Sequence, residues 1–257
     1  MRLAILTGGS KGLGLALCEA LAERGYRVLE FSRSAPHPYS VRIDLSSPSD
    51  SHRIVAAALA ALEGQQLEEL MVINNAAMLE PIGPASRKEP AAILANLNTN
   101  FTSAILILAE IVARFQDTAC RKVLANISSG AALKGYAGWS LYCGAKAGME
   151  NYIRALALEQ QSEPCPFIPV NIDPGVMDTG MQVCFAVHRL PTSLRLRASS
   201  SARSDALVRP EKVASAVCRI LELPSLAYGE RYKAVTMGRK PSSEHDGANA
   251  VRLFQKL

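Results

Sequence analysis

A glycine-rich turn near the start of the chain limits the possible folds more than any other feature. The run Thr7-Gly8-Gly9-Ser10-Lys11-Gly12-Leu13-Gly14 follows a short apolar segment, Leu3–Leu6, and opens an amphipathic helix expected over Gly12–Arg24. Glycines in such a turn let the backbone bend sharply, and the first turn of a helix offers unpaired N–H groups to an anion. The placement therefore predicts a pyrophosphate site between a first strand and a first helix.

Short β-rich runs and longer helical runs alternate through the rest of the chain. Further strands are expected at Val28–Phe31, Ser40–Ile43, Leu70–Ile73, Val123–Ile127, Ile168–Ile172 and Tyr232–Thr236, and further helices at Pro48–Leu62, Leu97–Phe115, Ser140–Gln160 and Pro210–Leu223. This alternation predicts an α/β fold of the doubly wound (Rossmann) type, a three-layer sandwich with a parallel sheet of about seven strands and helices on both faces. No repeat or linker interrupts the pattern, so residues 1–257 are expected to form one domain.

Composition and charge argue against several classes of protein. Hydrophobic residues make up 49% of the 257 residues and charged residues 20%, as in a globular protein with a sizeable core. No apolar stretch reaches the roughly 18 residues of a membrane span, and no signal peptide is expected. The net charge of +5 comes without basic runs interleaved with aromatic residues, so nucleic acid is not an expected partner. The six scattered cysteines lack a Cys-x-x-Cys pair, which predicts reduced thiols in a cytoplasmic protein and no metal site.

The segment 180–209 departs from the regular alternation. It contains five arginines and the run Ser199-Ser200-Ser201, with few strong helix signals. Long loops in compact domains are usually either functional or disordered. Two interpretations remain open, a solvated loop and a mobile lid that closes over a site.

Tyr142 and Lys146 are the strongest catalytic candidates. They are four residues apart at the start of an expected helix, so both side chains project from one face. A phenol has an ordinary pKa of about 10, and a nearby ammonium favours the phenolate and lowers that pKa. The pair is therefore suited to general acid–base chemistry, although a Tyr-x-x-x-Lys pattern by itself is common by chance.

The surrounding residues give this pattern its specificity, and together they resemble the short-chain dehydrogenase/reductase family. Ser129 follows the strand Val123–Ile127 and precedes Tyr142 by 13 residues, and Asn100 lies on the preceding long helix, with Asn98 as its rival. The resemblance implies Asn100, Ser129, Tyr142 and Lys146 as catalytic residues. In that family Tyr142 would protonate a carbonyl oxygen that Ser129 polarises, while Lys146 holds the ribose of a nicotinamide cofactor and Asn100 holds a water.

The resemblance also implies cofactor-binding residues at the carboxyl ends of the strands. They are Gly8, Ser10, Lys11, Gly12, Leu13, Gly14, Ser32, Arg33, Asp44, Leu45, Asn75, Ala76, Ala77, Tyr142, Lys146, Pro174, Gly175, Val176, Met177 and Thr179. Ser32 stands where NAD-binding members place an acid, and Arg33 follows it. A guanidinium can bind a 2′-phosphate with two hydrogen bonds, and Lys11 adds a second cation, so NADP(H) is the expected cofactor. Glu30, on the same strand face, keeps NADH open.

Two further segments resemble a particular branch of the family. The first, Gly138–Ala147 with Leu156–Glu159 further along, resembles sepiapterin reductases, and the second, Pro174–Gln182, resembles the same group and its bacterial relatives that reduce benzil to benzoin. Sepiapterin reductases carry an aspartate near the last strand that binds the pterin, and Lys233 stands at the matching position here. A lysine cannot accept the N–H groups of a pterin. A ketone or a vicinal or aromatic diketone is thus the expected small-molecule substrate, bound by Ser129, Gly130 and Tyr142.

Other functions remain open at this point. The same residues would serve a secondary-alcohol dehydrogenase or a sepiapterin-type pterin reductase, and a non-catalytic cofactor-sensing regulator is a more distant alternative. Relatives pair through the two helices expected here at Leu97–Phe115 and Ser140–Gln160. The resemblance therefore implies a homodimer, with a homotetramer as the alternative.

Overall fold

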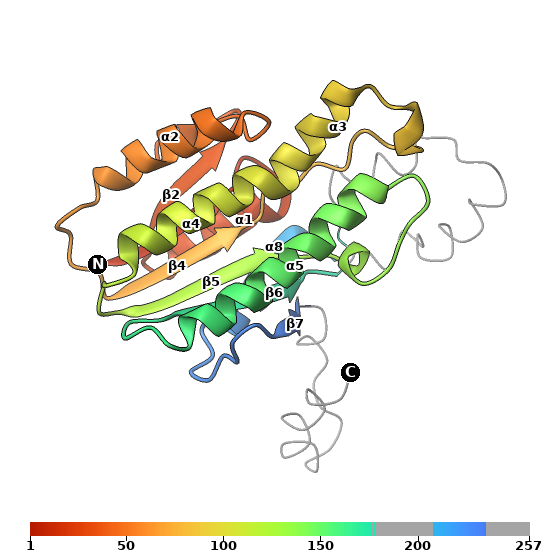
Figure 1. Cartoon of the computed structure of the whole chain (residues 1–257). Helices are drawn as coiled ribbons and strands as arrows, with labels where there is room; N and C mark the ends of the chain where they lie inside the picture. Colours follow the sequence, from red (N-terminus) through yellow and green to blue (C-terminus); the bar gives the residue numbers. More distant parts are fainter. Residues whose placement is uncertain (176, 178–207, 235–257) are drawn as a thin grey trace, which may run out of the picture.

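A parallel seven-stranded sheet forms the centre of the computed structural model, which describes residues 1–175, 177 and 208–234 (Figure 1). The strands are β1 (Arg2–Thr7), β2 (Arg27–Ser32), β3 (Ser40–Arg42), β4 (Glu69–Asn74), β5 (Arg121–Ile127), β6 (Phe167–Asp173) and β7 (Arg231–Lys233). They lie in the order β3-β2-β1-β4-β5-β6-β7, and all neighbouring pairs are parallel. This order confirms the expected doubly wound fold, because the chain moves outward from β1 and then restarts beside it with β4.

Helices cover both faces of this sheet. The α-helices are α1 (Gly12–Glu23), α2 (Pro48–Ala60), α3 (Pro90–Leu97), α4 (Ser103–Phe115), α5 (Ser140–Gln160) and α8 (Pro210–Leu221). One apolar cluster joins α2, α4 and α5 to the sheet, and a second joins α1 and α8 to its opposite face (Figure 1). The three layers expected from the sequence are therefore present.

One expected helix differs from the structure at its start. The helix expected over Leu97–Phe115 begins at Pro90, whose fixed φ suits the first turn of a helix. A π-helical turn, η2 (Asn98–Thr102), then separates α3 from α4. Such turns are rare and occur frequently at functional sites. The irregular stretch contains Asn100, one of the four predicted catalytic residues.

The same helical run corrects an expectation about membrane spans. Among the described residues, Pro90–Phe115 is long and apolar enough to cross a membrane, with a mean hydropathy of 1.4 over its best window. A core helix passes the same test of length and composition. Ile107, Leu108 and Ile111 of α4 are buried in the cluster that joins this helix to the sheet.

The central strands are buried on both faces. In β1, Leu3 and Ile5 point into the cluster on the α4 side, and Ala4 and Leu6 point into the cluster on the α1 side. All four are at most 1% exposed. Continuous apolar runs of this kind are typical of parallel strands that have helices on both sides.

A chain of buried amide side chains crosses the sheet near the carboxyl ends of these strands. Asn74 on β4 donates to Asn126 on β5 at 3.0 Å, and Asn126 donates to Asn171 on β6 at 2.8 Å. Asn171 in turn donates to the backbone carbonyl of Glu150 on α5 at 3.3 Å. Because the three asparagines are also paired in register, this amide ladder fixes three strand ends and one helix relative to one another.

The glycine-rich turn packs tightly against the end of β4. Gly8 has a φ of +74°, and a Cβ there would lie 2.8 Å from the Cα of Ala76. A Cβ on Gly14 would lie 2.0 Å from the carbonyl oxygen of Gly8 and 2.6 Å from the side-chain nitrogen of Asn75. The turn therefore has no room for side chains at these two positions.

A stability comparison tests this close packing. In Gly14→Ala the added methyl must displace backbone, and overpacking of this kind typically costs ~1–3 kcal/mol. For a chain of this size we expect Tm to fall by about 3–10 °C in differential scanning calorimetry. Gly144→Ala on α5 is the control, because its Cβ would meet nothing within 4 Å. Its Tm should stay the same or rise slightly, since alanine favours a helix more than glycine does. Equal Tm values for the two variants would contradict the packing described here.

Candidate active site

Three of the predicted catalytic residues meet at the carboxyl edge of the sheet. Ser129 lies just after β5, and Tyr142 and Lys146 lie one turn apart at the start of α5. The Tyr142 and Ser129 side chains are hydrogen-bonded, and the Lys146 Nζ lies 5.8 Å from the centroid of the Tyr142 ring. Ser129 Oγ also accepts a hydrogen bond from Ala131 N at 3.1 Å, at the start of a short 3-10 turn, η3 (Gly130–Ala132). This contact fixes the serine side chain beside the phenol.

Burial controls the protonation of the tyrosine. The Tyr142 side chain is buried, and desolvation raises the pKa of its phenol to about 12, although the hydrogen bond with Ser129 opposes this shift. The direction is opposite to the lowered pKa expected from the sequence. In the protein alone, burial outweighs the effect expected of Lys146. Tyr142 therefore keeps its proton at neutral pH, as a general acid must.

Lys146 is also buried, and its ammonium has a fixed partner. Its Nζ donates to the backbone carbonyl of Ile127 at 2.7 Å. Desolvation lowers the pKa of Lys146 to about 8. The charge of this lysine is thus sensitive to whatever binds beside it.

The structure places Asn100 and Asn98 in different surroundings. Asn100 is buried, and its side chain both donates to Met78 O at 2.8 Å and accepts from Met78 N at 2.9 Å. Asn98 donates instead to Ser46 O at 3.1 Å, at the loop before α2. Asn100 thus faces the loop after β4, beside the expected site, and its amide is already engaged.

The glycine-rich turn is held by β2 and by the loop after β4. Gly9 N donates to Glu30 Oε1 at 2.7 Å, and Asn75 Nδ2 donates to the carbonyl oxygens of Thr7 and Gly8. Ser10 and Gly12 are partly exposed and Lys11 is exposed, whereas Leu13 is buried. The turn therefore presents backbone and one cation outward. Ala76 packs beside Gly8, and Ala77 packs against a small cluster that includes Tyr142.

Glu30 and Ser32 are engaged within the protein. Glu30 is fully buried and accepts hydrogen bonds from Gly9 N and, at 3.2 Å, from Ser32 Oγ. Ser32 Oγ also accepts from Ala35 N. The sequence left Glu30 open as a partner for a ribose hydroxyl. The structure instead uses that carboxylate to hold the glycine-rich turn.

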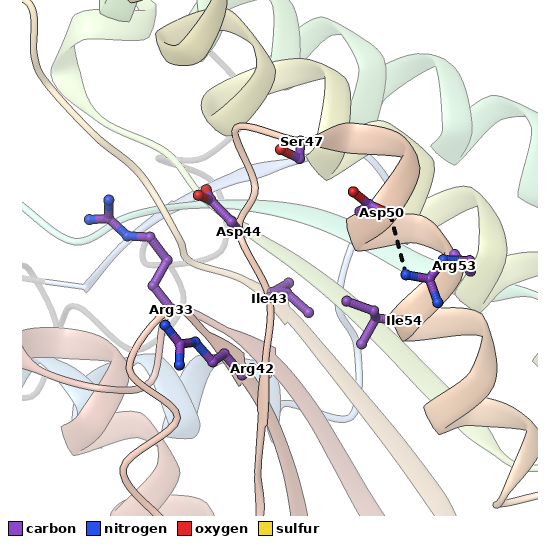
Figure 2. Close-up of a pocket in the computed structure, with 8 residues that line it drawn as sticks. All are labelled: Arg33, Arg42, Ile43, Asp44, Ser47, Asp50, Arg53 and Ile54. Atoms are coloured by element: carbon purple, nitrogen blue, oxygen red, sulfur yellow. Dashed lines mark hydrogen bonds and ion pairs between the residues drawn. The ribbon is translucent and has the colours of Figure 1, made fainter.

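A pocket of about 360 Å³ lies beside the end of β3 (Figure 2). Its lining residues are Arg33, Arg42, Ile43, Asp44, Ser47, Asp50, Arg53 and Ile54. Hydrogen bonds from Ser46 lower the pKa of Asp44, and the charge of Arg33 adds to that effect. Leu45 is buried beneath, with its carbonyl accepting from Ser103 Oγ at 2.6 Å. Among the described residues, Arg33 and Arg42 form no ion pair within 4.0 Å, whereas Arg53 pairs with Asp50. The structure thus places Arg33 and Asp44 on the wall of one pocket.

The segment after β6 is described only in part. Gly175 N donates to Asp173 Oδ1 at 3.0 Å, and Pro174 is buried. Met177 forms an isolated parallel bridge with Val208. Val176, Thr179 and residues 180–207 of the expected loop or lid lie outside the described residues, as does the end of the expected strand Tyr232–Thr236 beyond Ala234.

Aromatic side chains line the approach to Tyr142. The Trp139 ring meets the Tyr142 ring edge-on at 6.1 Å, and Tyr136 lies 5.2 Å from Trp139. Trp139 packs against a cluster that contains Leu79, Ile82, Ala131, Tyr142 and Cys143. A Cβ on Gly130 would lie 3.7 Å from the Tyr136 hydroxyl, so the predicted substrate residue Gly130 borders this aromatic wall. Sequence reasoning missed Tyr136, although its position between Ser129 and Tyr142 was a usable signal.

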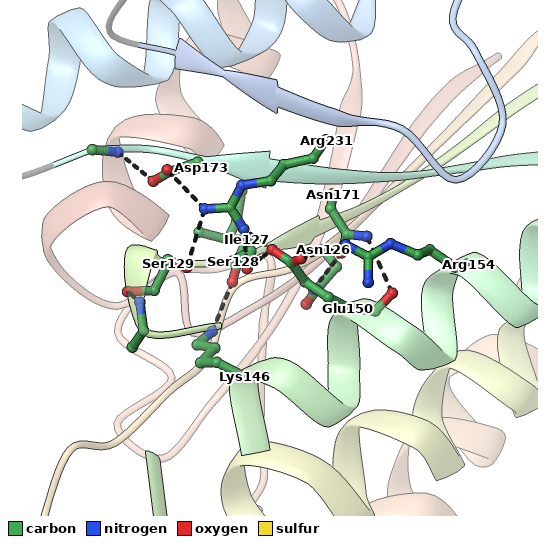
Figure 3. A network of polar contacts seen from close by, with 12 residues as sticks. Asn126, Ile127, Ser128, Ser129, Lys146, Glu150, Arg154, Asn171, Asp173 and Arg231 are labelled. Carbon is green, nitrogen blue, oxygen red and sulfur yellow. Dashed lines mark hydrogen bonds and ion pairs between the residues drawn. The ribbon is translucent and has the colours of Figure 1, made fainter. Parts of the chain in front are cut away.

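A partly buried arginine on β7 was also missed. Arg231 contacts the backbone of Ser129 and the carboxylates of Glu150 and Asp173 (Figure 3). Nothing in the sequence near Arg231 indicates these contacts, because its partners lie 58 to 102 residues away.

Comparison with known proteins agrees with this geometry. A family model described as short chain dehydrogenase matches residues 2–186. Benzil reductase ((S)-benzoin forming) from Bacillus subtilis is 31% identical over 86% of this chain and 94% of its own length. Sepiapterin reductase from Bos taurus is 28% identical over 70% of this chain and 74% of its own length.

Solved structures agree on the fold. The KRED1-Pglu enzyme superposes with a TM-score of 0.74 at 24% identity, covering 90% of this chain and 100% of the other. A short chain dehydrogenase from Burkholderia cenocepacia, solved in complex with NADP, has a TM-score of 0.71 at 21% identity, covering 90% of this chain and 95% of the other. At such identities the likeness concerns the fold alone.

Proposed function

The chain belongs to the short chain dehydrogenase family of oxidoreductases, and on that premise we propose that it is an NADPH-dependent carbonyl reductase with Tyr142 as proton donor. One observation carries the proposal. Ser129, Tyr142 and Lys146 meet at the carboxyl edge of the sheet, where burial keeps the phenol protonated at neutral pH. Ligands of doubly wound folds bind at that edge.

Each residue of this set has a distinct chemical task. NADPH supplies a hydride to the carbonyl carbon when it is bound. Tyr142 donates its proton to the carbonyl oxygen, and Ser129, hydrogen-bonded to the same phenol, orients and polarises that oxygen. Lys146 would move its ammonium from Ile127 O to the cofactor ribose, close enough to stabilise the phenolate that forms.

A conservative substitution tests the role of Tyr142. Tyr142→Phe removes the transferable proton and keeps most of the ring packing, so kcat should fall by at least ~10²-fold. Cofactor affinity, measured by fluorescence titration, should change little. Tyr152→Phe on the same helix is the control, because Tyr152 packs into the core away from the site. Near-normal turnover by Tyr142→Phe would overturn the assignment.

The choice of NADPH over NADH rests on charge at the end of β2. The Glu30 carboxylate is buried and engaged by Gly9 and Ser32, which removes it as a partner for the ribose hydroxyls. Lys11 and Arg33 are exposed cations, and Arg42 adds a third on the pocket wall. The narrow turn at Gly8 and Gly14 fits a close-lying pyrophosphate. Together these groups favour a cofactor that carries a 2′-phosphate.

Kinetic preference tests this choice. We expect kcat/KM with NADPH to exceed that with NADH by at least roughly tenfold, which requires only ~1.4 kcal/mol. Arg33→Asp should abolish or reverse the preference, because a carboxylate repels the 2′-phosphate. Arg53→Asp makes the same charge change in the same pocket at an arginine already paired with Asp50, and should preserve it. If both variants act alike, general surface charge rather than Arg33 sets the preference.

For the substrate we propose a ketone next to an aromatic ring or a second carbonyl. Tyr136 and Trp139 extend from Tyr142 as an aromatic wall, and the relatives named benzil reductase and sepiapterin reductase act on such compounds by their names. Lys233 ends β7 in register with Asp173, at the carboxyl edge of the sheet. A lysine there cannot accept the N–H groups of a pterin.

Two substrates separate these alternatives. We expect NADPH-dependent reduction of benzil to the hydroxyketone, with sepiapterin clearly poorer in kcat/KM. Lys233→Asp should improve sepiapterin relative to benzil, and Lys212→Asp on α8 controls for net charge. A wild-type preference for sepiapterin would contradict the role given to Lys233. If neither compound is reduced, the substrate proposal is wrong.

We further propose that the chain is one domain that works in the cytoplasm as a homodimer, with a homotetramer as the alternative. The expected contact faces are on α4 and α5. Leu158, exposed on α5, is an apolar side chain that such a contact would cover.

A further inference from the structure

Arg231 places a partly buried cation beside the proposed catalytic residues. Its side chain is 12% exposed. One terminal nitrogen donates to the Glu150 carboxylate and, at 3.4 Å, to Ser128 Oγ. The other donates to Ser129 O at 3.1 Å and to Asp173 Oδ2 at 2.8 Å (Figure 3). A single guanidinium thus joins β5, β6 and α5 from its place on β7.

Each of these partners carries a different part of the site. Ser129 is the serine that contacts Tyr142, and its carbonyl also accepts from Ala132 N at 3.0 Å. The second oxygen of Asp173 accepts from Gly175 N, in the segment expected to lie against the nicotinamide. Glu150 follows Lys146 by one helical turn, on the same face of α5. Arg231 therefore holds three functional segments at once.

Glu150 is directed away from Lys146 by these contacts. Its carboxylate is 1% exposed, and it contacts Arg231 and Ser128 through one oxygen and Arg154 through the other. Lys146 donates instead to Ile127 O. Without Arg231, the buried carboxylate would lose its innermost partner and could turn toward the ammonium one turn away.

Stability alone does not account for such an arrangement. A buried ion pair often contributes no more than apolar side chains of the same volume, since its charges must first be desolvated. In addition, Arg231 Nε is buried without a hydrogen-bond partner among the residues that the structure describes. The forked geometry of the guanidinium is better suited to fixing positions.

We propose that Arg231 is a positioning residue that fixes the Ser129 backbone and the Asp173–Gly175 segment and keeps the Glu150 carboxylate away from Lys146. Its effect on catalysis rests on the function proposed above. The anchoring itself does not, so the two can be tested separately.

Hydrogen–deuterium exchange tests the anchoring without any assay of activity. In Arg231→Met, the amides of residues 128–132, Asp173 and Gly175 should exchange at least about tenfold faster, while those of β1 stay unchanged. Arg231→Lys keeps a positive charge beside Glu150 but lacks the two terminal nitrogens that contact separate partners. It should therefore show the same local increase in amide exchange. Arg154→Met is the matched control, because Arg154, 48% exposed, contacts Glu150 and neither Ser129 nor Asp173. If Arg231→Met unfolds, Arg231→Met combined with Glu150→Gln removes both charges and serves in its place. Unchanged exchange in residues 128–132, Asp173 and Gly175 would overturn the proposal.

A double-mutant cycle tests the consequence for catalysis. Arg231→Met should lower kcat at least tenfold, whereas Arg154→Met should stay within about twofold. In a Ser129→Ala background the loss caused by Arg231→Met should be smaller, because the part of its effect that acts through Ser129 is then absent. Fully multiplicative losses would show a general structural effect and refute positioning through Ser129. If the wild-type chain reduces no carbonyl compound, the proposed function fails, and the exchange experiment still decides the anchoring.

Discussion

The amide ladder across β4, β5 and β6 is the contact on which the rest of the site depends. A parallel sheet can slip in register, and a slip of one residue would turn every side chain of a strand to the other face. Asn74, Asn126 and Asn171 prevent this, since each buried amide finds its partner only in the observed register. The ladder ends on the backbone carbonyl of Glu150, so the register of the sheet also fixes the position of α5 along the strands. Tyr142 and Lys146 on that helix thereby meet Ser129 at the end of β5.

Burial affects the polar groups of the site in two different ways. Tyr142 and Lys146 have no hydrogen-bonded carboxylate partner among the described residues, and burial moves both toward their neutral forms, raising the pKa of the phenol and lowering that of the ammonium. The buried Glu150 and the partly buried Arg231 instead form an ion pair. The first pair is free to exchange protons with a bound molecule, whereas the second is fixed. A cofactor ribose or a substrate oxygen would change the surroundings of the first pair only.

The sequence was a good guide wherever the signal was local. The strands, α5 and the relative placement of Ser129, Tyr142 and Lys146 follow from apolar runs and short spacings, and the structure agrees. It was a poor guide where contacts are distant or depend on packing. The π-helical turn at Asn98–Thr102 breaks the regular helical period. The hydrogen bonds from Gly9 to Glu30 and from Arg231 to Ser129 join residues that are 21 and 102 positions apart in the sequence. The raised pKa of Tyr142 likewise follows from burial, which spacing does not reveal.

The carboxylates and guanidinium groups around Tyr142 are paired with one another, which leaves Lys146 as the cation that most affects the phenol. Glu150 and Asp173 carry two negative charges, and Arg154 and Arg231 carry two positive charges in direct contact with them. Because each of these carboxylates is in direct contact with a guanidinium, the long-range fields of the four groups largely cancel. Lys146 is then a nearby cation that neither of these carboxylates pairs with, and its pKa of about 8 lies close to physiological pH. A bound molecule that accepts a hydrogen bond from Lys146 would favour its charged form further and so lower the pKa of the phenol. The acid–base strength of Tyr142 is therefore set at the moment of binding, which links proton transfer to occupation of the site.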